Sequence, residues 1–295
     1  MPTAKIVVGV DGSPPSVRAL CWAAREAQRR GASLGVLVAY NCRTPAARLP
    51  IDAAFEEYVR DLAMAVVDAA CGEARSIAPQ ADVGGTARCG DPAQVLVDAA
   101  DGAQMLVVGS RGGGGFAKLL AGSVSVQVAT RAPCPVAVVR GRDDNESDPV
   151  VVGVDGSASS DVATGVAFEE AARRDCPLLA VLAYNLSMPL WAMGPPPVAY
   201  DITEIQVELQ AALVGHVAAW RDRFPDVPAE YVIGRGSPGA VLAGWSRHAQ
   251  LAVVGSRGRG GTPPGPLIGS VGLQMIHHAE CPVLIARFPD GRPLP

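Results

Sequence analysis

The stretch Val7-Val8-Gly9-Val10-Asp11-Gly12-Ser13 recurs in this chain as Val151-Val152-Gly153-Val154-Asp155-Gly156-Ser157, an offset of 144 residues. Further along, Gly109-Ser110-Arg111-Gly112 returns as Gly255-Ser256-Arg257-Gly258. The chain therefore contains two copies of one unit. This unit is far longer than the repeat of a solenoid, so each copy is predicted to be a domain.

The domain boundaries follow from the repeat and from composition. With 295 residues, 49% of them apolar and 18% charged, the chain has the composition of a globular protein and the length of two domains. Residues 142–149 are polar and charged and lie between two apolar runs, which is typical of an exposed linker. We therefore expect a first domain at 1–141 (the first repeat) and a second at 150–295 (the second repeat). The linker is short, so the two should pack together.

Composition also excludes several classes of protein. A net charge of −4 argues against nucleic acid as the main partner, and no apolar run is long enough to span a membrane. The seven cysteines are odd in number and form no CxxC pair, so neither a disulfide framework nor a metal site is indicated. The sequence begins without a signal-peptide pattern, so we expect a cytoplasmic protein.

The periodicity predicts alternating strands and helices. In the first repeat, apolar β-branched runs predict strands at 6–10, 34–40, 82–89, 105–109 and 135–140, with helices at 14–30, 52–77, from 92 and at 123–130. Ser13 and Asp91, each followed by proline, are expected N-caps. The second repeat predicts strands at 150–154, 178–184, 230–233, 251–255 and 282–287, with helices after 157, at 204–224, from 238 and from 270. The predicted fold is α/β: two tandem, doubly wound, Rossmann-like domains, each with a five-stranded parallel sheet.

The chemistry-bearing motif is the glycine-rich loop between Gly109 and Ser123. Glycines let the backbone approach a ligand closely, and consecutive amides beside a helix N-terminus form an anion site. Ser123 and Ser125 can add hydroxyl donors, and Arg111 can pair with phosphate. The alternative is a solvent loop with an ordinary serine cap, and for Arg111 a solvated side chain. Recurrence of the loop in the second repeat favours the phosphate site.

The same residues carry a family resemblance. Gly109, Gly112, Gly122 and Ser123 fit the spacing G-x2-G-x9-G-[ST], and Cys134-Pro135-Val136 leads into the last strand. With the GVDGS opening, the chain resembles a tandem universal stress protein of the actinobacterial kind over nearly its whole length. This resemblance implies an adenine-nucleotide-binding fold that holds ATP, with or without Mg²⁺, at the carboxyl ends of the strands.

The resemblance also implies roles for individual residues. Glycines and serines of the loop would bind phosphate and ribose, Asp11 would bind the nucleoside, and the backbone near Val38 would meet the adenine. The site expected in the first repeat is Asp11, Val38, Ala39, Gly109, Arg111, Gly112, Gly122, Ser123, Val124 and Ser125. The site expected in the second repeat is Asp155, Ala183, Gly255, Arg257, Gly258, Gly269, Ser270 and Val271.

The second repeat departs from the pattern. Ten residues, not nine, separate Gly258 from Gly269, and Pro263, Pro264 and Pro266 lie between them. Each proline removes an amide donor, so we expect weaker binding in the second repeat.

Three functions remain open. The first is an ATP-binding regulatory stress protein, the second a slow Mg-dependent ATPase, and the third a dimeric interaction module without nucleotide. The first repeat has no histidine, and neither HExxH nor GxSxG occurs, so no catalytic residue is assigned. The resemblance also implies that the last strands of the two repeats pair within the chain and that chains form a homodimer. A protein partner is expected but not identified. Cys134 and Cys281 are interpreted as packing residues rather than redox switches.

Overall fold

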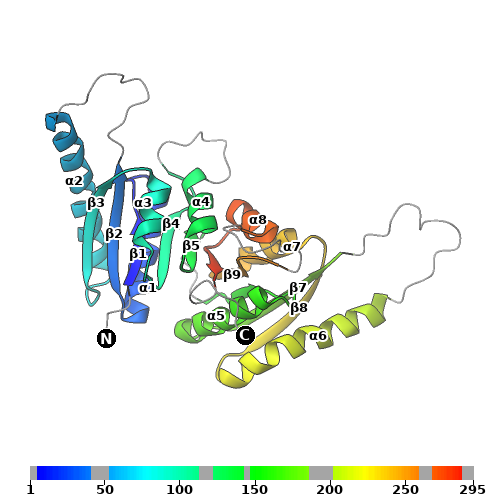
Figure 1. Cartoon of the computed structure of the whole chain (residues 1–295). Coiled ribbons are helices and arrows are strands. Elements are labelled where there is room, and N and C mark those ends of the chain that lie inside the picture. Colours follow the sequence, from blue (N-terminus) through cyan, green and yellow to red (C-terminus); the bar gives the residue numbers. More distant parts are fainter. Residues whose placement is uncertain are drawn as a thin grey trace, which may run out of the picture.

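The computed structural model of the chain describes residues 5–40, 53–112, 122–142, 147–185, 202–258 and 268–287. Each repeat is an α/β unit with helices on both faces of a sheet (Figure 1). The predicted strands and helices in the described residues are confirmed, with ends that shift by one or two residues.

The elements alternate through both repeats. The first repeat contains β1 (Lys5–Gly9), α1 (Pro14–Arg30), β2 (Ser33–Tyr40), α2 (Ala53–Ile77), β3 (Val83–Cys89), α3 (Pro92–Ala99), β4 (Met105–Gly109), α4 (Ser123–Arg131) and β5 (Val136–Val139). The second contains β6 (Val150–Gly153), α5 (Ala158–Arg174), β7 (Leu178–Tyr184), α6 (Ile202–Arg223), β8 (Ala229–Arg235), α7 (Pro238–Trp245), the 3-10 turn η2 (Ser246–His248), β9 (Leu251–Gly255), α8 (Ser270–His278) and β10 (Val283–Ala286).

The ten strands form one continuous sheet in the order β3-β2-β1-β4-β5-β10-β9-β6-β7-β8. Neighbouring strands within each repeat are parallel. Between the repeats, β5 and β10 pair antiparallel, with Val138 opposite Val283. The two predicted five-stranded parallel sheets are therefore confirmed, as is the pairing of the last strands within the chain.

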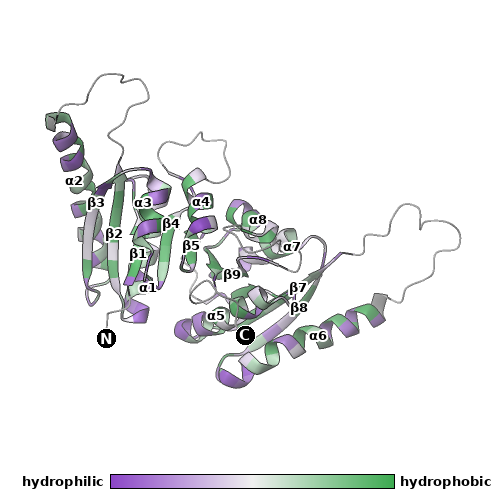
Figure 2. Cartoon of the chain, in the orientation of Figure 1, coloured by the Kyte–Doolittle hydropathy of each residue, from purple (hydrophilic) through white to green (hydrophobic). Residues whose placement is uncertain are grey.

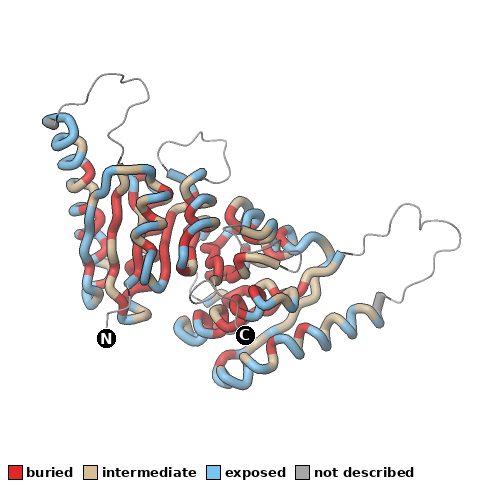
Figure 3. Tube along the Cα trace, in the orientation of Figure 1, coloured by how far each residue is buried: buried red, intermediate tan, exposed pale blue. Residues whose placement is uncertain are grey.

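The strands are buried on both faces, which explains their continuous apolar sequence. In β4, Leu106 packs with the core on the α3 and α4 side, and its neighbour Val107 with the core on the α1 and α2 side. Both cores continue across the joint into the second repeat, under α7 and α8 on one face and under α5 and α6 on the other. Figures 2 and 3 show the apolar, buried strands between helices whose outer faces are polar and exposed.

Helix starts agree with the sequence. Asp91 caps α3 by accepting from the Gln94 amide at 3.0 Å, as predicted. Ser13 is the N-cap residue of α1, as predicted, although its side chain makes no capping hydrogen bond. Its hydroxyl donates to Asp11 Oδ1 at 2.5 Å, a hydrogen bond to a charged acceptor. Among the described helices, none combines the length and apolarity that crossing a membrane requires.

Candidate functional site

The carboxyl ends of β1 and β4 meet at the predicted site of the first repeat. Asp11 follows β1, and its carboxylate lies against Gly112, which follows β4. A Cβ built on Gly112 would lie 2.6 Å from Asp11 Oδ2, so a larger residue there would displace the Asp11 carboxylate. The Asp11 amide donates to Ser16 Oγ at 3.2 Å, and the Ser13 amide donates to Asp11 Oδ1 at 3.0 Å. The aspartate is therefore held at the end of the sheet by its own turn.

The two ends of the glycine loop meet at the start of α4. The Gly122 amide donates to Ser110 O at 2.7 Å, and a Cβ on Gly122 would lie 3.3 Å from Arg111 Cα. No side-chain hydrogen bond caps α4. The first-turn amides and the positive end of the helix dipole are thus presented beside the loop, which is an arrangement suited to an anion.

The second repeat reproduces these contacts. A Cβ on Gly258 would lie 2.8 Å from Asp155 Oδ2, and the Gly269 amide donates to Ser256 O at 2.8 Å. The Asp155 amide donates to Ser160 Oγ at 3.1 Å. Because all three contacts recur, the arrangement belongs to the repeated unit and not to one loop.

A cavity of about 440 Å³ occupies the site of the second repeat. Its size lies within the roughly 300–1,000 Å³ range of small-molecule pockets. All eight residues that the sequence predicted for this repeat line it: Asp155, Ala183, Gly255, Arg257, Gly258, Gly269, Ser270 and Val271. The cavity thus joins the carboxyl ends of β6, β7 and β9 to the start of α8.

The sequence prediction missed part of this lining. The additional residues are Gly153, Val154, Ser160, Val181, Pro238, Leu242, Val254, Ile268 and Gly272. Pro238 opens α7 and Leu242 follows one turn later, so the α7 start faces the cavity. The Ser237-Pro238 pair was recognisable as a helix start, but nothing local in the sequence indicates which sheet edge that helix approaches.

The remaining residues predicted in the first repeat lie along the same edge. Val38 is buried and Ala39 half-buried at the end of β2, whereas Arg111 and Ser123 are exposed beside the loop. Val124 is half-buried in the first turn of α4. Ser125 is 1% exposed, and its hydroxyl donates to Gly122 O at 2.8 Å. Ser125 therefore supports the loop from inside, and its hydroxyl proton is already used there.

Other predicted features lie outside the described residues. They are the tip of the first glycine loop at 113–121, the prolines at 263, 264 and 266, and residues 143–146 of the linker. In the described part of the chain, no group of three or more histidine, cysteine or acidic side chains could hold a metal ion.

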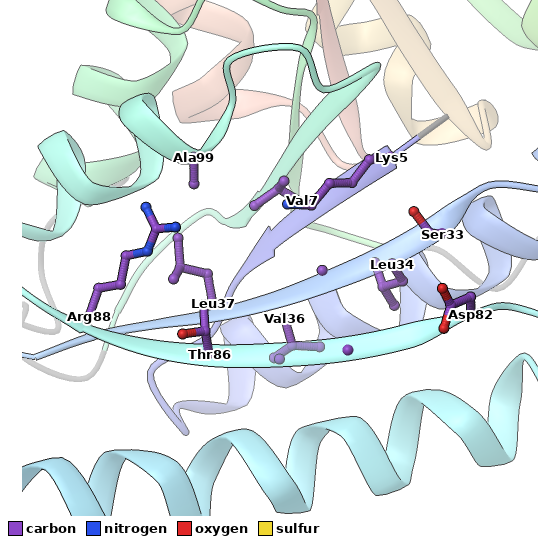
Figure 4. Close-up of a pocket in the computed structure, with 13 residues that line it drawn as sticks. Lys5, Val7, Ser33, Leu34, Val36, Leu37, Asp82, Thr86, Arg88 and Ala99 are labelled. Carbon is purple, nitrogen blue, oxygen red and sulfur yellow. The ribbon is translucent and has the colours of Figure 1, made fainter. Parts of the chain in front are cut away.

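A second cavity, of about 310 Å³, lies on the sheet face of the first repeat. Figure 4 shows Lys5, Ser33 and Asp82 toward one end and Arg88 toward the other. It runs along β1 to β3 rather than at the loop edge. Gly35 and Gly84 help to form it, and the second repeat has Leu179 and Glu230 in the corresponding register.

The cysteines before the last strands are buried in both repeats. Burial raises the pKa of the Cys134 thiol to about 11 and that of Cys281 to about 12. The reactive thiolate is therefore disfavoured at neutral pH, which supports the packing interpretation over a redox switch.

Comparison with known proteins agrees with this architecture. The sequence model of the Universal stress protein family matches residues 2–140 and 146–287. A universal stress protein of Mycobacterium tuberculosis is 37% identical over 294 residues, covering 96% of each chain. A second one from that organism is 34% identical over 299 residues, again covering 96% of each.

A solved structure shares the whole fold. The crystal structure of a universal stress protein from Archaeoglobus fulgidus superposes with a TM-score of 0.68, covering 97% of this chain and 99% of that one, at 19% identity. The family model covers both repeats of the chain. This chain therefore belongs to the universal stress protein family.

Proposed function

We propose that this chain is an ATP-binding regulatory stress protein that holds one nucleotide at the carboxyl edge of each repeat. Nucleotide occupancy would shift its conformation or its binding to a partner protein, and ATP would not be consumed in a fast reaction. We also propose that the protein acts in the cytoplasm, where ATP is abundant.

The observation that carries this proposal is the cavity of about 440 Å³ in the second repeat. Its lining includes Asp155, Arg257 and the start of α8, which are polar, together with aliphatic side chains such as Val181 and Leu242. A nucleotide needs both kinds of group, because it has an anionic phosphate end and a flat base.

Each group has a chemical task in this proposal. Amides of the glycine loop and the first turn of α4 or α8 would donate to phosphate oxygens. Asp11 and Asp155 would accept from ribose hydroxyls, since an ionised carboxylate is acceptor-only. Arg111 and Arg257 would balance the phosphate charge. Mg²⁺ would be bound through the phosphates, because it prefers few protein ligands in such sites.

A slow Mg-dependent ATPase is the second candidate. Bound Mg-ATP is partly activated, but the first repeat contains no histidine to act as a general base. Turnover of Mg-ATP at roughly 1–1,000 per second, the range of ordinary enzymes, would overturn the regulatory proposal. A dimeric interaction module without nucleotide is the third candidate.

The direct test is to denature the purified chain and identify the released small molecules by mass spectrometry. We expect an adenine nucleotide. Gly122→Glu and Gly269→Glu place a carboxylate beside Arg111 and Arg257, where phosphate would lie, so each variant should lose the nucleotide of its own repeat. Gly84→Ala is the matched control, because a Cβ there meets no atom within 4 Å. If the chain released no nucleotide and did not bind added ATP, the two ATP-dependent functions would be excluded and only the interaction module would remain.

The two sites are not proposed to be equal. The longer, proline-containing segment between Gly258 and Gly269 offers fewer amide donors, so the first repeat should bind ATP more tightly. Titration calorimetry of the two glutamate variants separates the sites. Equal affinities would contradict this asymmetry. We also propose that chains form a homodimer, which analytical ultracentrifugation tests.

A further inference from the structure

Arg140 connects the glycine loop of the first repeat to a helix of the second. It follows β5, whose last residue, Val139, accepts a hydrogen bond from the Ser110 amide at 3.0 Å. The Arg140 Nη1 donates to Ile276 O at 2.6 Å and to Met275 O at 3.2 Å. These carbonyls belong to the last turn of α8, where Met275 O also accepts from the Ala279 amide at 3.0 Å.

Arg287 makes the reciprocal connection. It follows β10, whose last residue, Ala286, accepts from the Ser256 amide at 3.1 Å. The Arg287 Nη2 donates to Ala129 O, near the carboxyl end of α4. The backbone of each arginine thus lies beside the loop of its own repeat. Its side chain contacts the carboxyl end of a helix in the other repeat, and the first turn of that helix forms the site there. The antiparallel pairing of β5 and β10 makes this possible, because the end of one strand lies beside the start of the other.

Both guanidinium groups lie in surroundings that disfavour their positive charge. Burial lowers the pKa of Arg140, and the nearby Arg111 lowers it further. Burial also lowers the pKa of Arg287; Cys134 opposes this shift and Arg257 adds to it. The Nε atoms of Arg140 and Arg287 are buried and have no hydrogen-bond partner among the described residues. A buried donor of this kind carries a free-energy cost that nearby negative charge reduces.

We propose that Arg140 and Arg287 are positioning residues that couple the two anion sites of the chain. An anion bound beside Arg111 removes the repulsion between Arg111 and Arg140. Arg140 then holds the carboxyl end of α8 more firmly, which fixes the amino end of α8 for the second anion. Arg287 acts in the opposite direction through α4.

The coupling is positive and reciprocal. An anion at the amino end of a helix and a cation at its carboxyl end both complement the helix dipole. Because α4 and α8 have nine residues each, or roughly 14 Å, each can act as one rigid body. By thermodynamic linkage, each site must change the affinity of the other by the same factor.

This inference rests on the proposed function, and ATP is the probe. Calorimetry first measures the second site in Gly122→Glu and the first site in Gly269→Glu. The second site of the wild type, measured with ATP bound at the first, should be roughly fivefold to tenfold tighter than the second site of Gly122→Glu, at the lower end of usual coupling strengths. Arg140→Gln should remove this difference, and Arg287→Gln should reduce it. Arg140 and the site that is measured thus lie in different repeats.

Arg142→Gln is the matched control. Arg142 also crosses to the second repeat, where its Nη2 donates to Arg247 O at 2.8 Å, but its side chain is 61% exposed. It should change neither affinity by more than about 1.5-fold, whereas Arg140→Lys, which keeps a charge and a donor, should recover much of the loss. Circular dichroism melts confirm that each variant is folded.

Hydrogen exchange provides a readout that does not require binding at the second site. Adding ATP to Gly269→Glu should slow amide exchange in the last turn of α8, and Arg140→Gln should abolish this change. Far-site affinities and exchange that do not respond to either arginine substitution would overturn the coupling and leave the proposed function intact. Failure of the wild-type chain to bind ATP would overturn both.

Discussion

Arg174 of α5 donates to the Glu26 carboxylate of α1 at 2.7 Å and so ties the second repeat to the first. Arg30 makes the mirror contact with Glu170. Because Glu26 and Arg30 lie 144 residues before Glu170 and Arg174, the cluster is symmetric about the joint. Both glutamates are fully buried, so the two repeats share an ionic cluster as well as a sheet.

Removing one member of this cluster should be costly. Glu26→Gln leaves two buried arginines facing only Glu170, and breaking a buried ion pair in this way costs roughly 3–5 kcal/mol. Glu169→Gln is the control, because its 3.2 Å contact with Arg173 is partly exposed and surface pairs contribute about 0–1 kcal/mol. Urea unfolding monitored by circular dichroism measures both. Equal effects would show that burial of the cluster does not matter.

The cluster also predicts a pH dependence. Burial and the neighbouring Glu26 carboxylate raise the pKa of Glu170 from its usual value of 4.5, and the arginines offset only part of this shift. The native state therefore holds this proton to a higher pH than the unfolded chain does. Stability from this group rises as the pH falls through its folded pKa toward 4.5.

Glu170→Gln removes that contribution and isolates it. The free energy of unfolding of the wild type should increase relative to that of the variant as the pH falls toward 4.5. Urea unfolding of both proteins over a series of pH values provides the measurement. A difference that stays constant, or that shrinks on acidification, would mean that the pKa of Glu170 is not raised.

Much of the fold could be predicted from the sequence because its signals are local and repeated. Strands such as β4 are continuous apolar runs, and Pro14 or Pro92 marks a helix start. The edge residues Asp11 and Gly112 were predicted together because parallel strands end on one edge. Their direct contact, however, depends on the path of the backbone, which spacing does not specify.

What the sequence could not predict depends on tertiary placement. The repeat register aligned Glu26 with Glu170, but nothing local indicated that α1 and α5 meet. Arg140 and Arg287 end two predicted strands, and nothing local in the sequence indicates that their acceptors are backbone carbonyls in the other repeat.

Contact between Asp11 and Gly112 gives a sensitive test of the first site. In Gly112→Ala, the new methyl group would lie 2.6 Å from Asp11 Oδ2 and would displace the carboxylate. We expect ATP affinity at that site to fall by about tenfold, equivalent to about 1.4 kcal/mol, with little change in stability. Calorimetry in the Gly269→Glu background measures it, and Gly84→Ala is the control. An unchanged ATP affinity would show that Asp11 does not contribute to nucleotide binding.

The thiols should differ sharply in reactivity. Cys281 is fully buried with its pKa raised by burial to about 12, whereas Cys89 is exposed on β3. At about pH 8, iodoacetamide should modify Cys89 in the native chain and Cys134 and Cys281 only after unfolding. Peptide mass spectrometry follows each site. If Cys281 in the native chain were labelled as fast as Cys89, the interpretation of Cys281 as a redox switch would be favoured.

We propose that both repeats bind an adenine nucleotide at the junction of the glycine loop with α4 or α8. Native mass spectrometry of the full chain titrated with ATP measures this binding. Two ATP molecules should bind per chain, the first more tightly, with one lost in Gly122→Glu and the other in Gly269→Glu. A chain that binds no ATP, or that still binds two ATP molecules in both variants, would show that these junctions are not the binding sites.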